Sequence, residues 1–178
     1  MLLFTDRSLS AMVHGLVLGG PALLALAASL FGLYLLAHPV ADPASREAAS
    51  GPLTVVLGSA ALATWLASIG GMYFVFPAYR AAPPEGATDL TAYPRSLLLS
   101  DPETAWLHSF GMETKEHLPW IAAFLVTAVA YVAWQYRGKV FQDAGIRTMS
   151  AAMVAVAFGI VSYVSLLGVF VNKVAPLE

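Results

Sequence analysis

Residues 149–171, MSAAMVAVAFGIVSYVSLLGVFV, form a long apolar run that contains no charged side chain. An α-helix needs about 20 consecutive, mostly apolar residues to cross the core of a bilayer. Three other stretches of the chain meet this requirement, at residues 9–37, 53–79 and 118–136. The sequence therefore predicts four membrane-spanning helices.

The fold class follows from the way lipid treats the peptide backbone. Backbone groups in a bilayer must be satisfied within the protein, so spans are helices or closed barrels, and four spans cannot close a barrel. We expect an all-α integral membrane protein, a four-transmembrane-helix up-down-up-down bundle in which residues 1–178 form a single transmembrane domain. Ala151, Ala155 and Gly159 recur every four positions, which predicts a close-packing face on the fourth span.

The connection between the second and third spans, about residues 80–117, is the longest in the chain. Its first part is rich in proline, which is typical of a surface loop. Its second part begins with SDPETAWLHSF at residues 100–110, which predicts an extra surface helix with Ser100 as its N-cap and Pro102 in its first turn.

Composition limits the classes of function. The chain is 58% hydrophobic and only 11% charged, far below the roughly 25% charged residues of a soluble domain. A net charge of -2 provides no basic footprint, so no nucleic-acid partner is expected. Cysteine is absent, which excludes disulfides, thiolate metal sites, iron–sulfur ligation and covalent c-type haem within this chain. Any metal must be held by His, Met or carboxylate groups.

The expected location is an integral position in a bacterial inner membrane, with lipid as the main surroundings. The first apolar run continues to Ala37, which is longer than the core of a signal peptide, so we expect it to be retained as a span. Arg137, Lys139 and Arg147 crowd the short loop between the third and fourth spans and favour a cytoplasmic position for it. Both termini and the long loop would then face the periplasm.

Two histidines are placed to share a cofactor. His14 lies about six residues inside the first span, roughly 9 Å below its start, and an ionisable side chain at that depth indicates function. The stretch WLHSFGMETKEHLPW, residues 106–120, places His117 at the start of the third span. Helices one and three of such a bundle are parallel, so both imidazoles lie at a similar depth, an arrangement that suits the two axial ligands of a haem iron.

The same stretch offers a second set of metal ligands. His108 and Met112 are one turn apart and form a His/Met pair of the kind that ligates haem or copper, although an ordinary amphipathic surface helix also explains them. His108 stands on the opposite face of a straight helix from His117, so the two can share a metal only where the helix bends, near Gly111 or Pro119. His108, Met112, Glu113 and His117 are therefore also candidates for a copper or zinc site at the membrane surface.

Several charged residues are candidates for supporting roles. Glu113, one turn before His117, is expected to orient its imidazole or to carry protons to a quinone. Arg80 and Arg95 are expected to neutralise haem propionates or anionic headgroups. We interpret Lys115 and Glu116 as part of a solvated helix start. His38, at the far end of the first helix, is interpreted as a polar terminator.

Two short strings carry a resemblance to known proteins. VHGLVLGG around His14 and EHLPW around His117 resemble small bacterial four-helix membrane b-type cytochromes. That resemblance implies haem b held between parallel helices and electron transfer between quinone and a partner subunit. GMYFVFPAYR and HSFGMETKEH also resemble an uncharacterised bacterial membrane protein family, to which we attach no activity.

The sequence thus favours a membrane electron-transfer protein that binds haem b between helices 1 and 3 and exchanges electrons with quinone or a cytochrome partner. One alternative is a non-catalytic membrane subunit or assembly factor of a larger respiratory complex, docked through the long loop. The other is the copper or zinc site. Enzymatic activity and homo-oligomer formation stay open. Transport is disfavoured, because no ionisable residue besides His14 is expected deep in a span.

Overall fold

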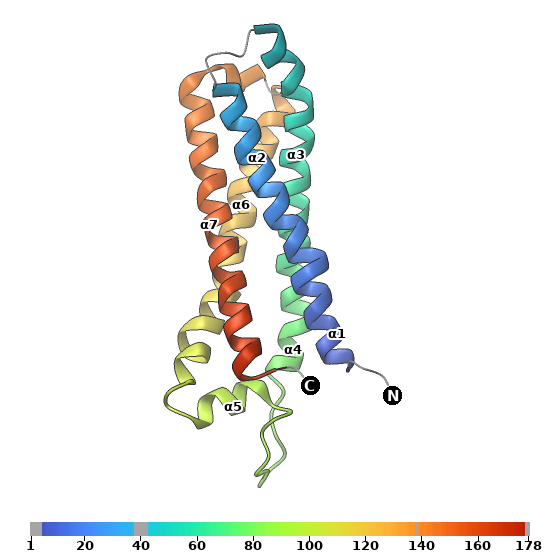
Figure 1. Cartoon of the computed structure of the whole chain (residues 1–178), viewed down its shortest axis with the longest axis vertical. Helices are drawn as coiled ribbons and strands as arrows, with labels where there is room; N and C mark the ends of the chain where they lie inside the picture. Colours follow the sequence, from blue (N-terminus) through green and yellow to red (C-terminus); the bar gives the residue numbers. More distant parts are fainter. Residues whose placement is uncertain (1–4, 38–42, 138, 177–178) are drawn as a thin grey trace.

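Four long helices run side by side along the molecule in the computed structural model, which describes residues 5–37, 43–137 and 139–176 (Figure 1). Within these residues the structure is helical and contains no strand. The first long helix is made of α1 (Asp6–Met12), η1 (Val13–Gly19) and α2 (Gly20–Ala37), and the second of α3 (Pro43–Gly70), η2 (Gly71–Val75) and α4 (Phe76–Tyr79). The third comprises η3 (Leu107–Met112) and α6 (Glu113–Gln135), and the fourth is α7 (Ala144–Val174).

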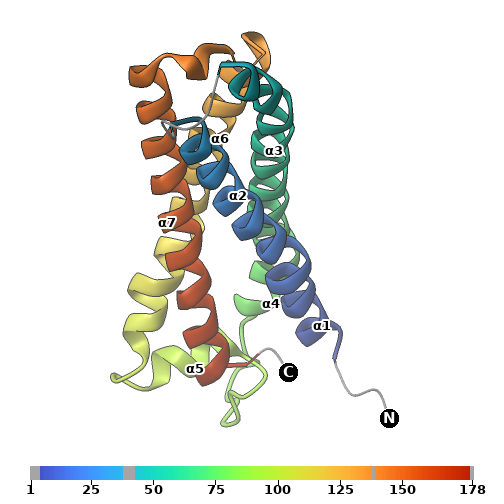
Figure 2. The ribbon, with the colours of Figure 1, turned by 45° about the horizontal axis from the view of Figure 1, so that its top comes forward.

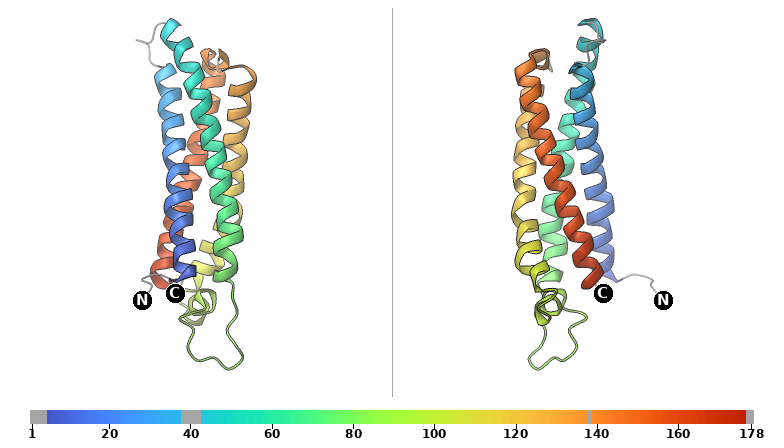
Figure 3. Two further views of the ribbon diagram at one scale, coloured as in Figure 1. Left: turned by 90° about the vertical axis from the view of Figure 1, so that its right-hand side faces the viewer. Right: turned by 60° about the vertical axis from the view of Figure 1, so that its left-hand side comes forward.

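The long helices form a closed ring of neighbours. α2 packs on α3, α3 on α6, α6 on α7, and α7 on α2. Consecutive long helices run in opposite directions, as the views from other sides also show (Figure 3). The first and third helices are therefore parallel and lie across the bundle from one another. The directions of the four long helices agree with the predicted up-down-up-down arrangement.

Each of the four is long and apolar enough to cross a membrane, over Asp6–Ala37, Glu47–Tyr79, Leu107–Gln135 and Ala144–Val174. These ranges confirm the predicted number and order of the apolar helices, although the third begins at Leu107 rather than at residue 118. Large apolar side chains are exposed around the bundle, including Leu16, Leu24, Phe31, Phe124 and Leu166. Such a surface suits lipid and is unusual for a protein in water.

The fourth helix is turned differently from the prediction. Ala155 and Gly159 are exposed, so the expected close-packing face of small residues is wrong. The buried face of α7 instead contains Val154, Ala157 and Val161. These residues recur every three or four positions, which is the spacing that keeps one face of an α-helix toward the bundle.

Three of the four long helices contain a π-helical segment, and all three segments lie toward the same end. η1 and η2 each end two residues before a proline, Pro21 and Pro77 respectively. A proline ring removes one helical hydrogen bond and crowds the preceding turn, so a widened turn just before it relieves the conflict. η3 contains Gly111, where the sequence predicted a helix irregularity. We call the end that holds these segments the lower end, as in Figure 1.

The surface helix that the sequence predicted from Ser100 onward does not form as a separate helix, because the residues after Ser100 turn directly into the third long helix, which begins at Leu107. Ser100 is the last residue of α5 (Pro94–Ser100), and its hydroxyl bonds the Leu97 carbonyl, so its assignment as N-cap is wrong. Asp101 has an extended backbone and accepts the bonds of the turn that follows α5: its backbone oxygen accepts from Ala105 N at 2.9 Å and its carboxylate from Glu103 N at 2.9 Å. The short α5 is the extra helix of the loop.

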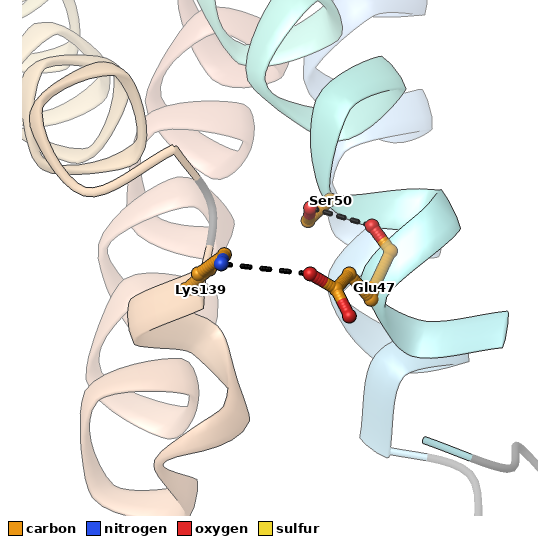
Figure 4. A network of polar contacts seen from close by, with 3 residues as sticks. All are labelled: Glu47, Ser50 and Lys139. Carbon is orange, nitrogen blue, oxygen red and sulfur yellow. Dashed lines mark hydrogen bonds and ion pairs between the residues drawn. The ribbon is translucent and has the colours of Figure 1, made fainter. Parts of the chain in front are cut away.

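The opposite, upper end of the bundle is closed by a short connection. η4 (Lys139–Gln142) leads into α7, whose N-cap is Asp143. Figure 4 shows the Lys139 amine 3.5 Å from a Glu47 carboxylate oxygen, and the Ser50 hydroxyl donating to the Glu47 carbonyl at 2.7 Å. Both ends of the ion pair are exposed, so it contributes little to stability. No cofactor candidate among the described residues lies here, and His38 falls outside them.

Candidate functional site

The lower half of the bundle contains a partly open cavity of about 1100 Å³. The first helix and α7 lie close together at the upper end and diverge below (Figure 2), and α7 packs on α2 but not closely on α1 or η1. All four long helices contribute to the walls. The volume is at the upper end of the range for pockets that hold cofactors and other small molecules.

Two apolar clusters close the cavity above and below. The upper cluster fills the other half of the bundle and reaches down to Ala61, Ala122 and Val161 on successive helices. The lower cluster joins the ends of the helices to the loop and includes Tyr79, Leu98, Leu107, Met112, Val171 and Ala175. Between Val161 and Val171, the residues of α7 that line the cavity are Val164, Ser165, Gly168 and Val169.

His14 lines this cavity and packs against glycine. A methyl group added at Gly71 would lie 2.8 Å from His14 Cε1, so only glycine lets the imidazole approach η2 so closely. Neither ring nitrogen has a hydrogen-bond partner among the described residues, and Nδ1 is buried. A buried polar atom without a partner costs roughly 1–3 kcal/mol, so it points to a missing ligand, ion or water.

Lys115 extends into the same cavity, which the sequence did not predict. Its amine donates to the Val164 carbonyl of α7 at 3.1 Å. A methyl group added at Gly168 would lie 2.6 Å from the amine, so the glycine makes room for it. The expectation of a solvated helix start is wrong for this residue. The charge of Lys115 also acts on His14, which lines the cavity from the first helix.

The expectation of a solvated helix start is also wrong for Glu116. It lines the cavity, and its Oε1 atom is buried without a hydrogen-bond partner among the described residues. The spacing of the buried residues of α6, followed toward the N-terminal end of the helix, indicates that Lys115 and Glu116 face the bundle. The buried positions at Val126 and Ala122 continue in steps of three or four through Pro119 to Lys115, Glu116 and Met112, which all line the cavity.

His117 occupies the opposite stripe of α6. It is exposed, as are Ile121 and Phe124 on the same side, and it does not line the cavity. Its Nδ1 lies 2.7 Å from the Glu113 backbone carbonyl, so the contact between these two residues is made by the main chain and not by the Glu113 carboxylate. The structure does not bring His14 and His117 to one cavity.

His108 is held in a chain of hydrogen bonds beneath the cavity. Its Nε2 accepts from Arg95 Nε at 3.3 Å, and its Nδ1 lies 2.9 Å from the Tyr79 hydroxyl. Because the guanidinium can only donate, Nε2 carries no proton, and Nδ1–H donates to the Tyr79 oxygen. The hydroxyl hydrogen of Tyr79, a cavity-lining residue, is then free to donate to another acceptor.

Both ring nitrogens of His108 are engaged in hydrogen bonds, so His108 is not free to bind a metal in this arrangement. Among the described residues, no group of three or more His, Asp or Glu side chains is placed to hold a metal ion. Arg80 lies with its guanidinium carbon 5.1 Å from the centre of the Phe76 ring, and neither Arg80 nor Arg95 lines the cavity. Of the predicted ligands, the cavity therefore brings together His14 and Met112.

The comparisons with known proteins add no family. The chain matches no protein-family model, no curated protein and no solved structure.

Proposed function

We propose that this protein is a membrane electron-transfer protein that binds haem b in the lower cavity, where His14 and Met112 would hold the iron. It exchanges electrons with a quinone or a cytochrome partner from a bacterial inner membrane. The single observation that carries this proposal is the unsatisfied imidazole of His14 beside a cavity of about 1100 Å³ that Met112 also lines. A haem iron supplies one-electron chemistry, and His/Met is one of its known ligand sets.

The residues around the cavity suit such a group. His14 comes from the first helix and Met112 from the start of the third, so a flat ligand between them would be contacted from both parallel helices. Gly71 lets the His14 ring lie close to the second helix, where it has no hydrogen bond within the described residues. Most of the surface that lines the cavity is apolar, which suits an apolar macrocycle.

This version of the proposal differs from the expected pair of histidines in one ligand. Met112 replaces His117, because the side of α6 that faces the bundle carries Met112 and the outward side carries His117. The predicted location between helices 1 and 3 is kept. Thioether ligation in place of a second imidazole raises the reduction potential of a haem.

The test is a reduced-minus-oxidised absorption spectrum of the purified protein after expression with ample haem. We expect a low-spin b-type spectrum that His14→Ala abolishes and that Met112→Leu converts to a high-spin form. His117→Ala is the matched control on the outer face of the same helix and should leave the spectrum unchanged. A protein without any haem band, or one that loses it on His117→Ala but not on Met112→Leu, would refute this ligand assignment.

A further inference from the structure

The Lys115 side chain lines the cavity with a cationic amine, and only one of the hydrogen bonds that this amine can donate is made. Its single hydrogen bond goes to the Val164 carbonyl, although an ammonium group has three N–H donors. Within residues 5–37, 43–137 and 139–176, no carboxylate lies at ion-pairing distance from it. A charge that is taken out of water without a counter-charge is strongly unfavourable. The cavity therefore lacks an anion at this point.

We infer that Lys115 anchors the carboxylate of an amphipathic acid that occupies the cavity. The inference rests on the proposed function in one respect, because haem is itself such an acid, with propionates attached to an apolar ring. It goes further in naming the residue that recognises the acid and the class of ligand. A long-chain fatty acid has the same two parts, a carboxylate and an apolar body.

The amine is positioned before any ligand binds. The Val164 carbonyl fixes it at 3.1 Å, and the absent side chain of Gly168 provides its space. Ser165 next to this point has donated its own hydrogen to the Val161 carbonyl at 2.7 Å, so it does not compete as a donor. Two N–H groups of Lys115 are left for the ligand, which matches the two oxygens of one carboxylate.

His14 is a further group in the cavity that can donate a hydrogen bond to an acid. The unpartnered nitrogens of His14 offer one further donor in the neutral ring, and the charge of Lys115 reaches this residue. Glu116 is not the missing counter-ion, because its buried oxygen has no hydrogen-bond partner and makes no ion pair with Lys115. Lys115 is the only Lys or Arg that lines the cavity among the described residues, so it is the one cationic side chain there that can bind a carboxylate.

The remaining walls suit an apolar body. Leu23, Val75, Trp120 and Val161 face the cavity from the four helices. Trp120 is itself fixed by contact with Trp65, whose ring centre lies 5.8 Å away. These surfaces exclude water around the carboxylate, which strengthens its attraction to the amine.

The experiment uses ligands without iron, so that its outcome is independent of axial ligation. Binding of protoporphyrin IX and of its dimethyl ester is measured by fluorescence on the full chain in detergent, as is displacement by hexadecanoic acid and by its methyl ester. Lys115→Met replaces the amine by a neutral chain of similar length. Lys173→Met, at the exposed end of α7 and outside the cavity, is the matched control for binding to the micelle.

We expect Lys115→Met to weaken binding of the free acids roughly 10- to 100-fold and to leave the esters within about twofold, as the loss of a charged hydrogen bond implies. Gly168→Ala, which keeps the amine but displaces it, should weaken the acids by a smaller factor, and Lys173→Met should change neither. A Lys115-dependent preference for acid over ester in either series supports the inference, and the series that shows it identifies the apolar body.

The inference is overturned when neither series prefers acid over ester, or when Lys115→Met retains the preference while a melting curve shows that it is folded. Failure of the proposed function would look different. A protein without a haem spectrum that still prefers hexadecanoic acid through Lys115 would refute haem ligation and retain the carboxylate anchor.

Discussion

Gly71 determines where the His14 side chain can lie. Gly71→Ala would bring a methyl group to 2.8 Å from His14 Cε1, so the imidazole would have to shift away from η2. We expect a loss of about 1–3 kcal/mol in the free energy of unfolding, typical of overpacking, together with weaker haem retention. Thermal unfolding in detergent measures the first effect and absorbance titration the second.

The matched control is Gly58→Ala in the same long helix. An added methyl group there meets nothing within 4 Å, so the substitution should stabilise the helix by about 0.5–1 kcal/mol. Equal melting temperatures for the two variants would contradict the close approach of His14 to Gly71.

His108 has a structural role that its exposed neighbour in sequence, His117, does not share. His108→Ala would leave the buried Tyr79 hydroxyl without its present partner and would release Arg95. We expect a loss of about 1–3 kcal/mol for the unsatisfied hydroxyl. His117→Ala removes a side chain on the outer face and should change stability by less than about 0.5 kcal/mol. Chemical denaturation of both variants gives the comparison, and a larger loss for His117→Ala would invert these roles.

At the scale of elements, Asp101 stabilises the turn that joins α5 to the third helix. Asp101→Ala removes the side-chain acceptor of Glu103 N, and we expect a cost of about 0.5–2 kcal/mol. Ser100→Ala removes only a bond to a nearby carbonyl and should cost less. Hydrogen exchange of the amides at residues 103–105 measures the local effect. Faster exchange in Ser100→Ala than in Asp101→Ala would restore Ser100 as the cap.

The three π-helical segments are the elements that the sequence indicated least. Gly111 and Pro119 suggested an irregular third helix, and η3 lies where Gly111 does. The corresponding signals for η1 and η2, a proline two residues beyond each segment, are visible in the sequence only once the segments are known. A π-helical turn changes which side chains share a face, and therefore simple spacing rules fail across it.

At the scale of the whole molecule, the arrangement predicts a definite orientation in a membrane. The loop at residues 80–93 and η4 lie at opposite ends of the bundle. The cationic loop between the third and fourth helices is expected in the cytoplasm. Because the chain has no cysteine, single Thr88→Cys and Gln142→Cys variants can be labelled specifically by a membrane-impermeant maleimide.

We expect Thr88→Cys to react in intact bacterial cells, and Gln142→Cys to react only after the membrane has been disrupted. Both positions are exposed in the folded protein, so accessibility depends on the side of the membrane alone. The reverse pattern would invert the orientation. Labelling of both positions in intact cells would contradict a membrane-spanning bundle.

The sequence by itself determined the number of long apolar helices, their order and the parallel directions of the first and third. The physical reason is that length and hydropathy are local properties, and short connections leave few ways to arrange four helices. It also identified His14 as the ionisable residue of the first helix. These conclusions needed no knowledge of which face of each helix turns inward.

Only the tertiary structure decided which side chains meet. His117 and Lys115 are two residues apart, yet Lys115 reaches the α7 backbone while His117 is exposed on the outer face. The direction of each side chain depends on the rotation of its helix against its neighbours, which is set by packing of the apolar clusters and by the π-helical turns. A difference of two positions rotates a side chain by about 200° around an α-helix, and that rotation separates the cavity from the surface.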